Sequence, residues 1–358
     1  MKRWLVVMLV VILGASFTLI KVPEMVAQDV APTRSPAAKM PERLIWSCDK
    51  PGQAPYEQSL AVTKLVSRQL TVTLHPYPNL DAALIGISKK KVDLCLPTAS
   101  LVYHMARGIT SDLQQIGIEE PCRELRLLMG GSVLWWSWIT LPDSNIKTIA
   151  DLKGKKVNYM TPGHGLKTAI GEDTLRAVGI DPVKDVKNIS YDDTNVAKEG
   201  LQHKKIDALL SALAGAKLLE LRSMVGLEVI PTPPEIYKAF RPGLKRVMIS
   251  SEVPGKYLTV IDKPTFLLGH QLLLVCREDL HEEAAYLIVK TIMENARELH
   301  KIGPVFKEWG VKQFALPLQL VAPVHSGAMK YFKEAGMWTP AHEAQQQEVV
   351  AELAKLSK

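Results

Sequence analysis

The hydrophobic pattern of the chain alternates between short apolar runs and amphipathic segments. From Leu44 the pattern predicts a strand at 44–47, a helix through 60–68, a strand at 70–74, a helix at 80–88, a strand at 92–96 and a helix at 100–106. Strands that alternate with helices are typical of a parallel sheet with helices on its faces. We therefore predict an α/β fold, whose loops at the carboxyl ends of the strands can hold a ligand.

Two long apolar stretches, Leu125–Leu141 and Thr265–Arg277, interrupt this alternation and predict two long strands. Between them lies a second alternating unit, with strands at 157–160, 187–191, 206–210 and 227–230 and helices at 166–178, 194–203 and 216–224. Long strands that bound an inserted unit predict two lobes, joined by two crossings, with a cleft between them. Lobe 1 comprises 42–138 plus 248–358, and lobe 2 comprises 139–247.

After the second long strand the chain is predicted to be helical at 281–301, 304–309, 324–335 and 344–356, packed back on lobe 1. Asp279 is a plausible cap for the first of these helices.

The N-terminal segment has the pattern of a targeting signal. Lys2 and Arg3 precede an uncharged stretch from Trp4 to Ile20, which predicts that residues 1–27 are a signal peptide or an N-terminal membrane anchor. Residues 28–41, rich in Pro and Ala, form a linker. Either reading predicts a periplasmic or extracytoplasmic location, with tethering through the N-terminal segment as the alternative to cleavage near Ala27.

The charge and cysteine content narrow the function. The net charge of +7 is spread along the chain, and its only run, Lys89–Lys91, is expected on a solvated helix end, so nucleic acid is not an expected partner. None of the four cysteines belongs to a CxxC pair, so no zinc or other metal site is predicted. Cys48 and Cys95 lie on strands that can be neighbours, and a disulfide and buried reduced thiols both remain open.

The clearest candidate for binding is the stretch 148–179, TIADLKGKKVNYMTPGHGLKTAIGEDTLRAVG, which reads as strand, glycine-containing loop and helix. The start of a helix has unpaired N–H groups and the positive end of the helix dipole, which suit a carboxylate or another anion. His164 and Lys167 add side-chain donors. The loop fits neither GxGxxG nor GxxxxGK[ST], so no nucleotide cofactor is expected.

The remaining candidates follow predicted strands, and their side chains can converge on the same cleft. Trp136, from the cluster Trp135, Trp136 and Trp138, can form an apolar wall, although packing in the core explains such a cluster equally well. The predicted ligand-binding residues are Gln53, Tyr56, Asn79, Thr98, Ser100, Tyr103, Trp136, Thr161, Gly163, His164, Gly165, Lys167 and Ser211.

Several segments resemble the solute-binding subunit of a TRAP transporter of the TAXI type. VHSGAMKYFKEAGMW, at 324–338, is similar to the C-terminal signature of that family, TIADLKGKKV with TPGHG resembles its second-lobe opening, and KIDALLSALAGA and VPGKY also match. The resemblance covers about 44–340. It implies the two-lobed periplasmic-binding-protein type II fold, no catalysis and no cofactor. It also implies delivery of a small polar solute, an organic acid, to the membrane permease subunits of an ion-driven transporter.

The first-lobe loops depart from this family, because CDKPGQAPYEQ and YPNLD replace glycine-rich segments. A membrane-tethered solute sensor or scaffold domain is therefore the alternative function. An enzyme is not predicted, since His164 and His325 lack a nucleophile motif such as GxSxG and no catalytic residue can be named. His325 is expected to cap or pack at a helix start.

Overall fold

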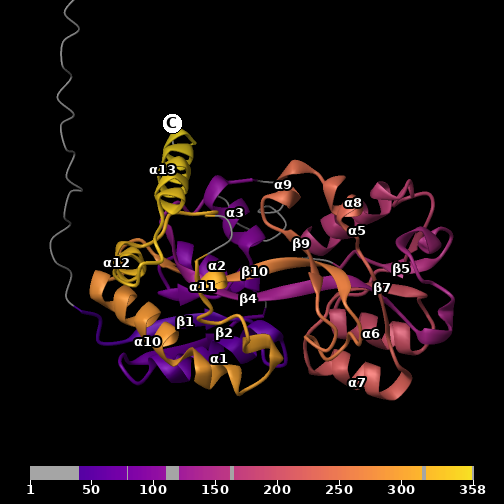
Figure 1. The fold of residues 1–358 in the computed structure, drawn as a ribbon, viewed down its shortest axis with the longest axis horizontal. Helices are drawn as coiled ribbons and strands as arrows, with labels where there is room; N and C mark the ends of the chain where they lie inside the picture. The colour runs from indigo at the N-terminus through magenta and orange to yellow at the C-terminus, as the bar shows by residue number, and fades with distance from the viewer. Residues whose placement is uncertain (1–39, 79, 110–120, 162–164, 317–319, 357–358) are drawn as a thin grey trace, which may run out of the picture. The chain divides into compact units, whose positions relative to one another are not determined.

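Two long central strands organise the protein. The structure is a computed structural model that describes residues 40–78, 80–109, 121–161, 165–316 and 320–356. The strands β4 (Leu125–Thr140) and β10 (Thr265–Arg277) run antiparallel across the middle of the molecule in Figure 1. Both are almost entirely buried, which explains their near-continuous apolar sequences. The two long strands were predicted from that pattern, and the prediction is confirmed.

The other strands extend the sheet on both sides of this pair. The order is β2-β1-β3-β10-β4-β7-β5-β6, with β8 paired to β4 and β9 paired to β10. The pairs β1–β2, β1–β3, β5–β6 and β5–β7 are parallel. The bounds are β1 Leu44–Cys48, β2 Val72–Pro76, β3 Leu94–Cys95, β5 Lys156–Asn158, β6 Lys187–Asn188, β7 Ala208–Ala212, β8 Glu228–Ile230 and β9 Ile249–Val253. The predicted α/β class is confirmed.

Helices connect the parallel strands and cover the sheet. The half of the sheet from β10 to the edge strand β2 is called the β2 side, and the half from β4 to the edge strand β6 is called the β6 side. The helices of the β2 side are α1 (Ala54–Val66), α2 (Leu80–Ser88) and α3 (Ala99–Arg107), and those of the β6 side are α5 (Gly165–Ala177), α6 (Thr194–Gln202) and α7 (Ala216–Val225). The short helices α8 (Pro234–Lys238), α9 (Pro242–Lys245) and α11 (Lys312–Ala315) were not predicted, and neither was β9. Proline at the first turn starts α8 and α9, and each is too short for a helical period.

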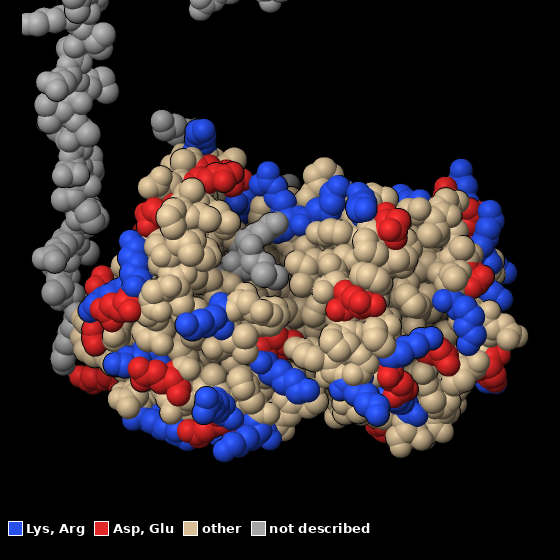
Figure 2. All heavy atoms as spheres, in the orientation of Figure 1, with Lys and Arg blue, Asp and Glu red and all other residues tan. Residues whose placement is uncertain are grey.

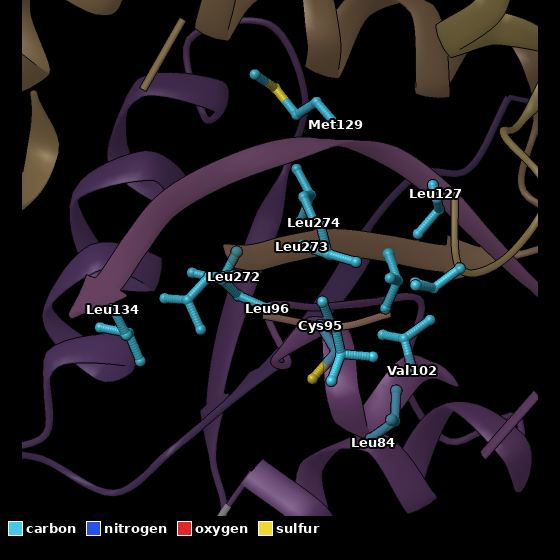
Figure 3. Close-up of a cluster of buried hydrophobic side chains, with 14 of the residues drawn as sticks. Leu84, Cys95, Leu96, Val102, Leu127, Met129, Leu134, Leu272, Leu273 and Leu274 are labelled. Atoms are coloured by element: carbon cyan, nitrogen blue, oxygen red, sulfur yellow. The ribbon is translucent and has the colours of Figure 1, made fainter. Parts of the chain in front are cut away.

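The largest hydrophobic core lies along the long strands and includes residues of the helices on both sides of them, such as Val62 of α1 and Ile170 of α5. Figure 3 shows Leu127, Met129 and Leu134 of β4 and Leu272, Leu273 and Leu274 of β10, together with Val102 of α3 and Leu84 of α2. These side chains are buried, and burying one Leu or Val stabilises the fold by roughly 1.5–3 kcal/mol.

The two crossing strands are irregular at the same level. The register of β10 against β4 shifts between Gln271 and Leu273, which pair with Val133 and Gly130. A Cβ atom at Gly130 would lie 2.1 Å from the carbonyl oxygen of Phe314, so only glycine fits there. The extra residue at this point lies in β4, and a bulge bends and twists the strand that contains it, so β4 bends here.

The C-terminal helices pack on the β2 side, as predicted. They are α10 (Glu282–His300), which contacts α1 and α12 (Ser326–Glu334), and α13 (Pro340–Lys355). His325 caps α12, since its Nδ1 accepts from the Gly327 N–H at 3.2 Å and its Nε2 lies 2.9 Å from the Leu280 carbonyl oxygen, so its predicted role is confirmed.

The predicted cap Asp279 is wrong. The N-cap of α10 is His281, and Asp279 instead accepts a hydrogen bond from Arg277 at 2.8 Å. The segment predicted to be helical at 304–309 is a short 3₁₀ helix, Pro304–Phe306.

The four cysteines are buried and free, so Cys48 and Cys95 do not form a disulfide. Burial raises the pKa of the Cys48, Cys95 and Cys122 thiols to about 12. Among the described residues no helix is long and apolar enough to span a membrane.

Lobe boundaries stay a prediction. The contacts hold 39–358 together as one unit, and the sheet is continuous from β2 to β6.

On the face drawn in Figure 2, lysine and arginine are interspersed with aspartate and glutamate.

Candidate functional site

A cavity of about 240 Å³ lies where the strand ends of the β2 side face those of the β6 side. Its lining comes from the loops after β1, β3 and β7, the starts of several helices and the central strands. Seven of the predicted site residues line it: Gln53, Thr98, Ser100, Trp136, Gly165, Lys167 and Ser211.

Helices of both sides begin at this cavity. The lining residues Gln53, Thr98, Asp193 and Gly215 are the N-caps of α1, α3, α6 and α7, and Gly165 is the first residue of α5. Thr98 and Asp193 cap their helices through the side chain, whereas Gln53 and Gly215 do not. The starts of α1 and α7 therefore have N–H groups that can donate hydrogen bonds to an anion, and the helix dipoles add to that attraction.

Lys167, on the first turn of α5, is the most deeply buried cation of the site, with 1% of its surface exposed. Its Nζ donates to Asn158 Oδ1 at 2.5 Å and Thr161 Oγ1 at 3.0 Å, which are neutral acceptors. Within the described part of the chain it has no carboxylate partner. Burial, with a smaller contribution from Lys198, lowers the pKa of Lys167 to about 7.

Lys198, on α6, is a second buried cation in the same wall, with 7% of its surface exposed. Its Nζ donates to Asn195 Oδ1 at 3.1 Å, and no described carboxylate forms an ion pair with it. Burial lowers its pKa to about 8, against the opposing effect of Asp193. An unpaired buried ammonium is costly, so two of them in one cavity are a strong electrostatic signal.

The other cations of the lining are already paired. Lys50 forms an ion pair with Asp193 at 3.0 Å, and Lys217 lies 3.5 Å from Glu199 and 3.4 Å from Glu220.

Asp49, beside Lys50, also lines the cavity. Burial raises the pKa of its carboxyl to about 6, although the Lys50 N–H donates to it at 2.8 Å.

The central strands supply an aromatic and apolar wall. Trp136 of β4 packs edge-on against His270 of β10, and its Nε1 donates to His270 Nε2 at 3.3 Å. His270 is 2% exposed, and burial lowers its pKa to about 3, so the imidazole is neutral at physiological pH. Leucines complete the wall: Leu80, Leu101, Leu134, Leu166, Leu209 and Leu210.

The Trp cluster divides between the two roles that the sequence left open. Trp136 lines the cavity, whereas Trp138 is fully buried and donates through Nε1 to Thr174 Oγ1 at 2.9 Å. Trp135 is also buried.

Six predicted residues do not line the cavity or cannot be placed. Tyr56 and Tyr103 are half-buried on α1 and α3, and the Tyr103 ring packs against the Arg107 guanidinium at 4.0 Å. Thr161 is buried and does not line the cavity, but its hydroxyl oxygen accepts a hydrogen bond from Lys167, which does. Asn79, Gly163 and His164 lie outside the described residues. Ser211 lies within β7 rather than after it, because that strand ends at Ala212.

The lining also contains functional side chains that the predicted set did not include, among them Asp49, Asp193, Lys198 and His270. Lys198 and Asp193 could have been found, because they flank the start of a predicted helix that follows a strand. His270 also has a signal, as a lone histidine within the apolar run FLLGHQLLLVC. In the described part of the chain, no group of three His, Cys, Asp or Glu could hold a metal ion.

The comparison with known protein families decides the membership of the chain. Residues 83–336, which make up most of the chain, match the NMT1-like family. The chain belongs to the NMT1-like family. The match includes α3, α5 and α6 of the site, so Thr98, Lys167 and Lys198 of this NMT1-like protein lie within it.

This NMT1-like protein is similar to several solved structures. A periplasmic transporter structure superposes with a TM-score of 0.52 at 13% identity and covers 87% of this chain and 98% of its own. A putative sulfonate-binding protein, SsuA from Methylobacillus flagellatus KT, has a TM-score of 0.47 at 14% identity and covers 86% and 94%. An ancestral arginine-binding protein has a TM-score of 0.43 at 16% identity and covers 75% and 99%.

Proposed function

We propose that this NMT1-like protein is an extracytoplasmic solute-binding protein that captures a small organic anion in the cavity at Lys167. The observation that carries the proposal is the pair of buried lysines, Lys167 and Lys198, without carboxylate partners among the described residues. The starts of α1 and α7 add backbone donors, and the wall of leucines with Trp136 suits an apolar body.

The charged end of the solute is expected at the start of α5. An ammonium and neighbouring N–H groups bind an anionic oxygen with charge-assisted hydrogen bonds, each worth roughly 1.5–3 kcal/mol. Lys167 is held by Asn158 and Thr161, so it is oriented before the solute arrives. His164, one residue before the first residue of α5, is a further candidate donor.

The transport role follows from the sequence resemblance together with the fold. The periplasmic transporter structure shares the fold, and the C-terminal tract resembles TAXI-type TRAP subunits. We infer that the protein hands its solute to the membrane subunits of an ion-driven permease. The uncharged segment from Trp4 to Ile20 supports export across the membrane.

Native mass spectrometry of the purified protein, followed by calorimetry with any solute that co-purifies, tests the proposal. An organic anion is expected, and Lys167→Met should weaken its binding at least ten-fold. The control is Lys205→Met, which removes an exposed lysine that does not line the cavity. Equal binding by wild type and Lys167→Met would place the anion site elsewhere. Failure to bind any organic anion in a broad screen would refute the function.

A further inference from the structure

The two buried lysines also indicate how much charge the solute carries. Lys167 and Lys198 come from α5 and α6 and line the same cavity. They are close enough for Lys198 to lower the pKa of Lys167. Their hydrogen-bond partners, Asn158, Thr161 and Asn195, are neutral. When both lysines are protonated, a monoanion leaves one buried ammonium uncompensated, whereas a dianion neutralises both.

Of the other charges of the lining, Asp193 raises and Lys217 lowers the pKa of Lys198, so their effects at the lysine end oppose each other. Lys50 is balanced by Asp193, and Lys217 is balanced by the two glutamates near it. Asp49 adds a negative charge next to Lys50, in the loop between β1 and α1, which disfavours a second anionic group at that side of the cavity. The excess positive charge therefore belongs to α5 and α6.

The rest of the wall favours both negative charges on one group. An extended dicarboxylate would place its second carboxylate against the leucines and Trp136, or near Asp49, where no unpaired described cation receives it and the start of α1 offers only backbone N–H donors. A phosphoryl group carries close to two charges at neutral pH, with its second pKa near 6, and has three acceptor oxygens. Among the described residues the lining contains no arginine, the residue that best fits a planar carboxylate, while lysine and helix N-termini suit a phosphoryl group.

We propose that the solute carries one doubly charged phosphoryl group on an apolar body, with that group between Lys167 and Lys198 and the body against Trp136. This inference rests on the proposed function and makes it more specific. The donors expected around the group are the start of α5, the start of α7 and the two ammonium groups.

Matched esters separate charge from shape. The probes are methyl, propyl and phenyl phosphate, each paired with the sulfate ester of the same alcohol, which has the same tetrahedral shape but a single charge. Inorganic phosphate is the probe without a body. Calorimetry at about pH 7 measures the affinity of each. We expect at least one phosphate ester to bind ten-fold or more tightly than its sulfate partner, and more tightly than inorganic phosphate.

The variants assign the preference to the second lysine. Lys198→Met should reduce the ratio of phosphate to sulfate affinity to about one to three, with the sulfate affinity changed much less than the phosphate affinity. Lys205→Met should keep the wild-type ratio, because it removes an exposed charge. Circular dichroism shows whether each variant is folded. Lys167→Met provides a second variant if Lys198→Met does not fold.

The outcomes distinguish the two proposals. Equal affinity for phosphate and sulfate partners, or a preference for sulfate, would overturn the phosphoryl inference while the anion-binding function stands. Binding of a carboxylate in preference to every phosphate ester would do the same. Binding of no anion would overturn both.

Discussion

At the scale of single residues, Lys167 is where function conflicts with stability. The folded protein lowers the pKa of Lys167 from about 10.5 to about 7 by burial. A protein that only needed to be stable would place an apolar side chain there, because a desolvated ammonium is destabilising. We therefore interpret Lys167 as a binding residue whose charge a bound anion compensates.

Lys167→Met is expected to stabilise the protein in acid while it weakens anion binding. Below about pH 7 the lysine is charged in both folded and unfolded states, and the full desolvation cost is present. Between about pH 7 and 10.5 the folded state has lost the proton and the unfolded state keeps it. The desolvation cost therefore decreases as the pH rises and is absent above about pH 10.5. We expect a gain of roughly 1–3 kcal/mol at pH 6 that shrinks toward pH 10, since lost hydrogen bonds offset part of it.

Denaturant unfolding at several pH values measures this difference, with Lys205→Met as the control for loss of one positive charge. A variant that is less stable than wild type at pH 6 would show that the hydrogen bonds to Asn158 and Thr161 outweigh the desolvation of Lys167.

Anion affinity should fall as the pH rises above about 7. The bound anion favours the charged form of Lys167, so binding takes up a proton when the free protein has lost it. The affinity should be constant just below that pH and fall roughly ten-fold per unit above it, with a further fall above about pH 8 from Lys198.

Calorimetry with the identified anion, in two buffers of different ionisation enthalpy, measures both the affinity and the proton uptake. His270 does not contribute to the profile, because burial lowers its pKa to about 3. A flat profile from pH 6 to 9 would contradict a charged lysine as the anion partner.

At the scale of elements, the C-terminal signature is a packing motif. His325 caps α12, and Gly327 lies so close to α10 that a Cβ atom there would be 2.1 Å from the Glu282 carbonyl oxygen. The tract VHSGAMKYF therefore joins α12 to the start of α10 and does not line the cavity. Its value for recognising the fold comes from this close approach of two backbones.

Gly327→Ala should destabilise the protein by about 1–3 kcal/mol, because α12 must move away from α10 to admit the methyl group. Ser326→Ala, at the exposed neighbouring position, is the control and should change stability by less than about 1 kcal/mol. Urea unfolding measures both, and anion affinity should be unchanged in each. Equal stability of the two variants would mean that the helices are not in tight contact.

Prediction from sequence succeeded where a pattern is long or local, and failed where the site depends on distant segments. The apolar runs of β4 and β10 are longer than ten residues and nearly continuous, so they stand out clearly in the sequence. Lys198 and His270 meet in one lining only because α6 and β10 converge in three dimensions. Tyr56 and Tyr103 follow strands as expected, but they lie within α1 and α3 and do not line the cavity, which the spacing alone does not reveal.

At the scale of the whole molecule, the ion pair between Lys50 and Asp193 spans the cavity. Lys50 belongs to the loop after β1 and Asp193 to the loop before α6, and the side chains meet at 3.0 Å. The bulge of β4 between Gly130 and Val133, opposite Leu272 of β10, is where this crossing strand bends. We therefore predict that the cavity closes on its solute by bending there, and that this ion pair favours the closed form.

Distances between spin labels on opposite sides of the cavity test this prediction, with labels on Lys91→Cys and Lys187→Cys, both exposed positions. The native cysteines are buried, which protects them from labelling. Lys50→Met should raise the ratio of long to short distances in the ligand-free protein about 1.4- to 5-fold, because an exposed ion pair contributes about 0.2–1 kcal/mol. Saturating solute should restore the short distance. Arg68→Met is the matched control, since it removes the ion pair with Glu298, which lies entirely on the β2 side. If all three proteins gave the same distances with and without solute, neither the hinge nor the role of Lys50 would survive.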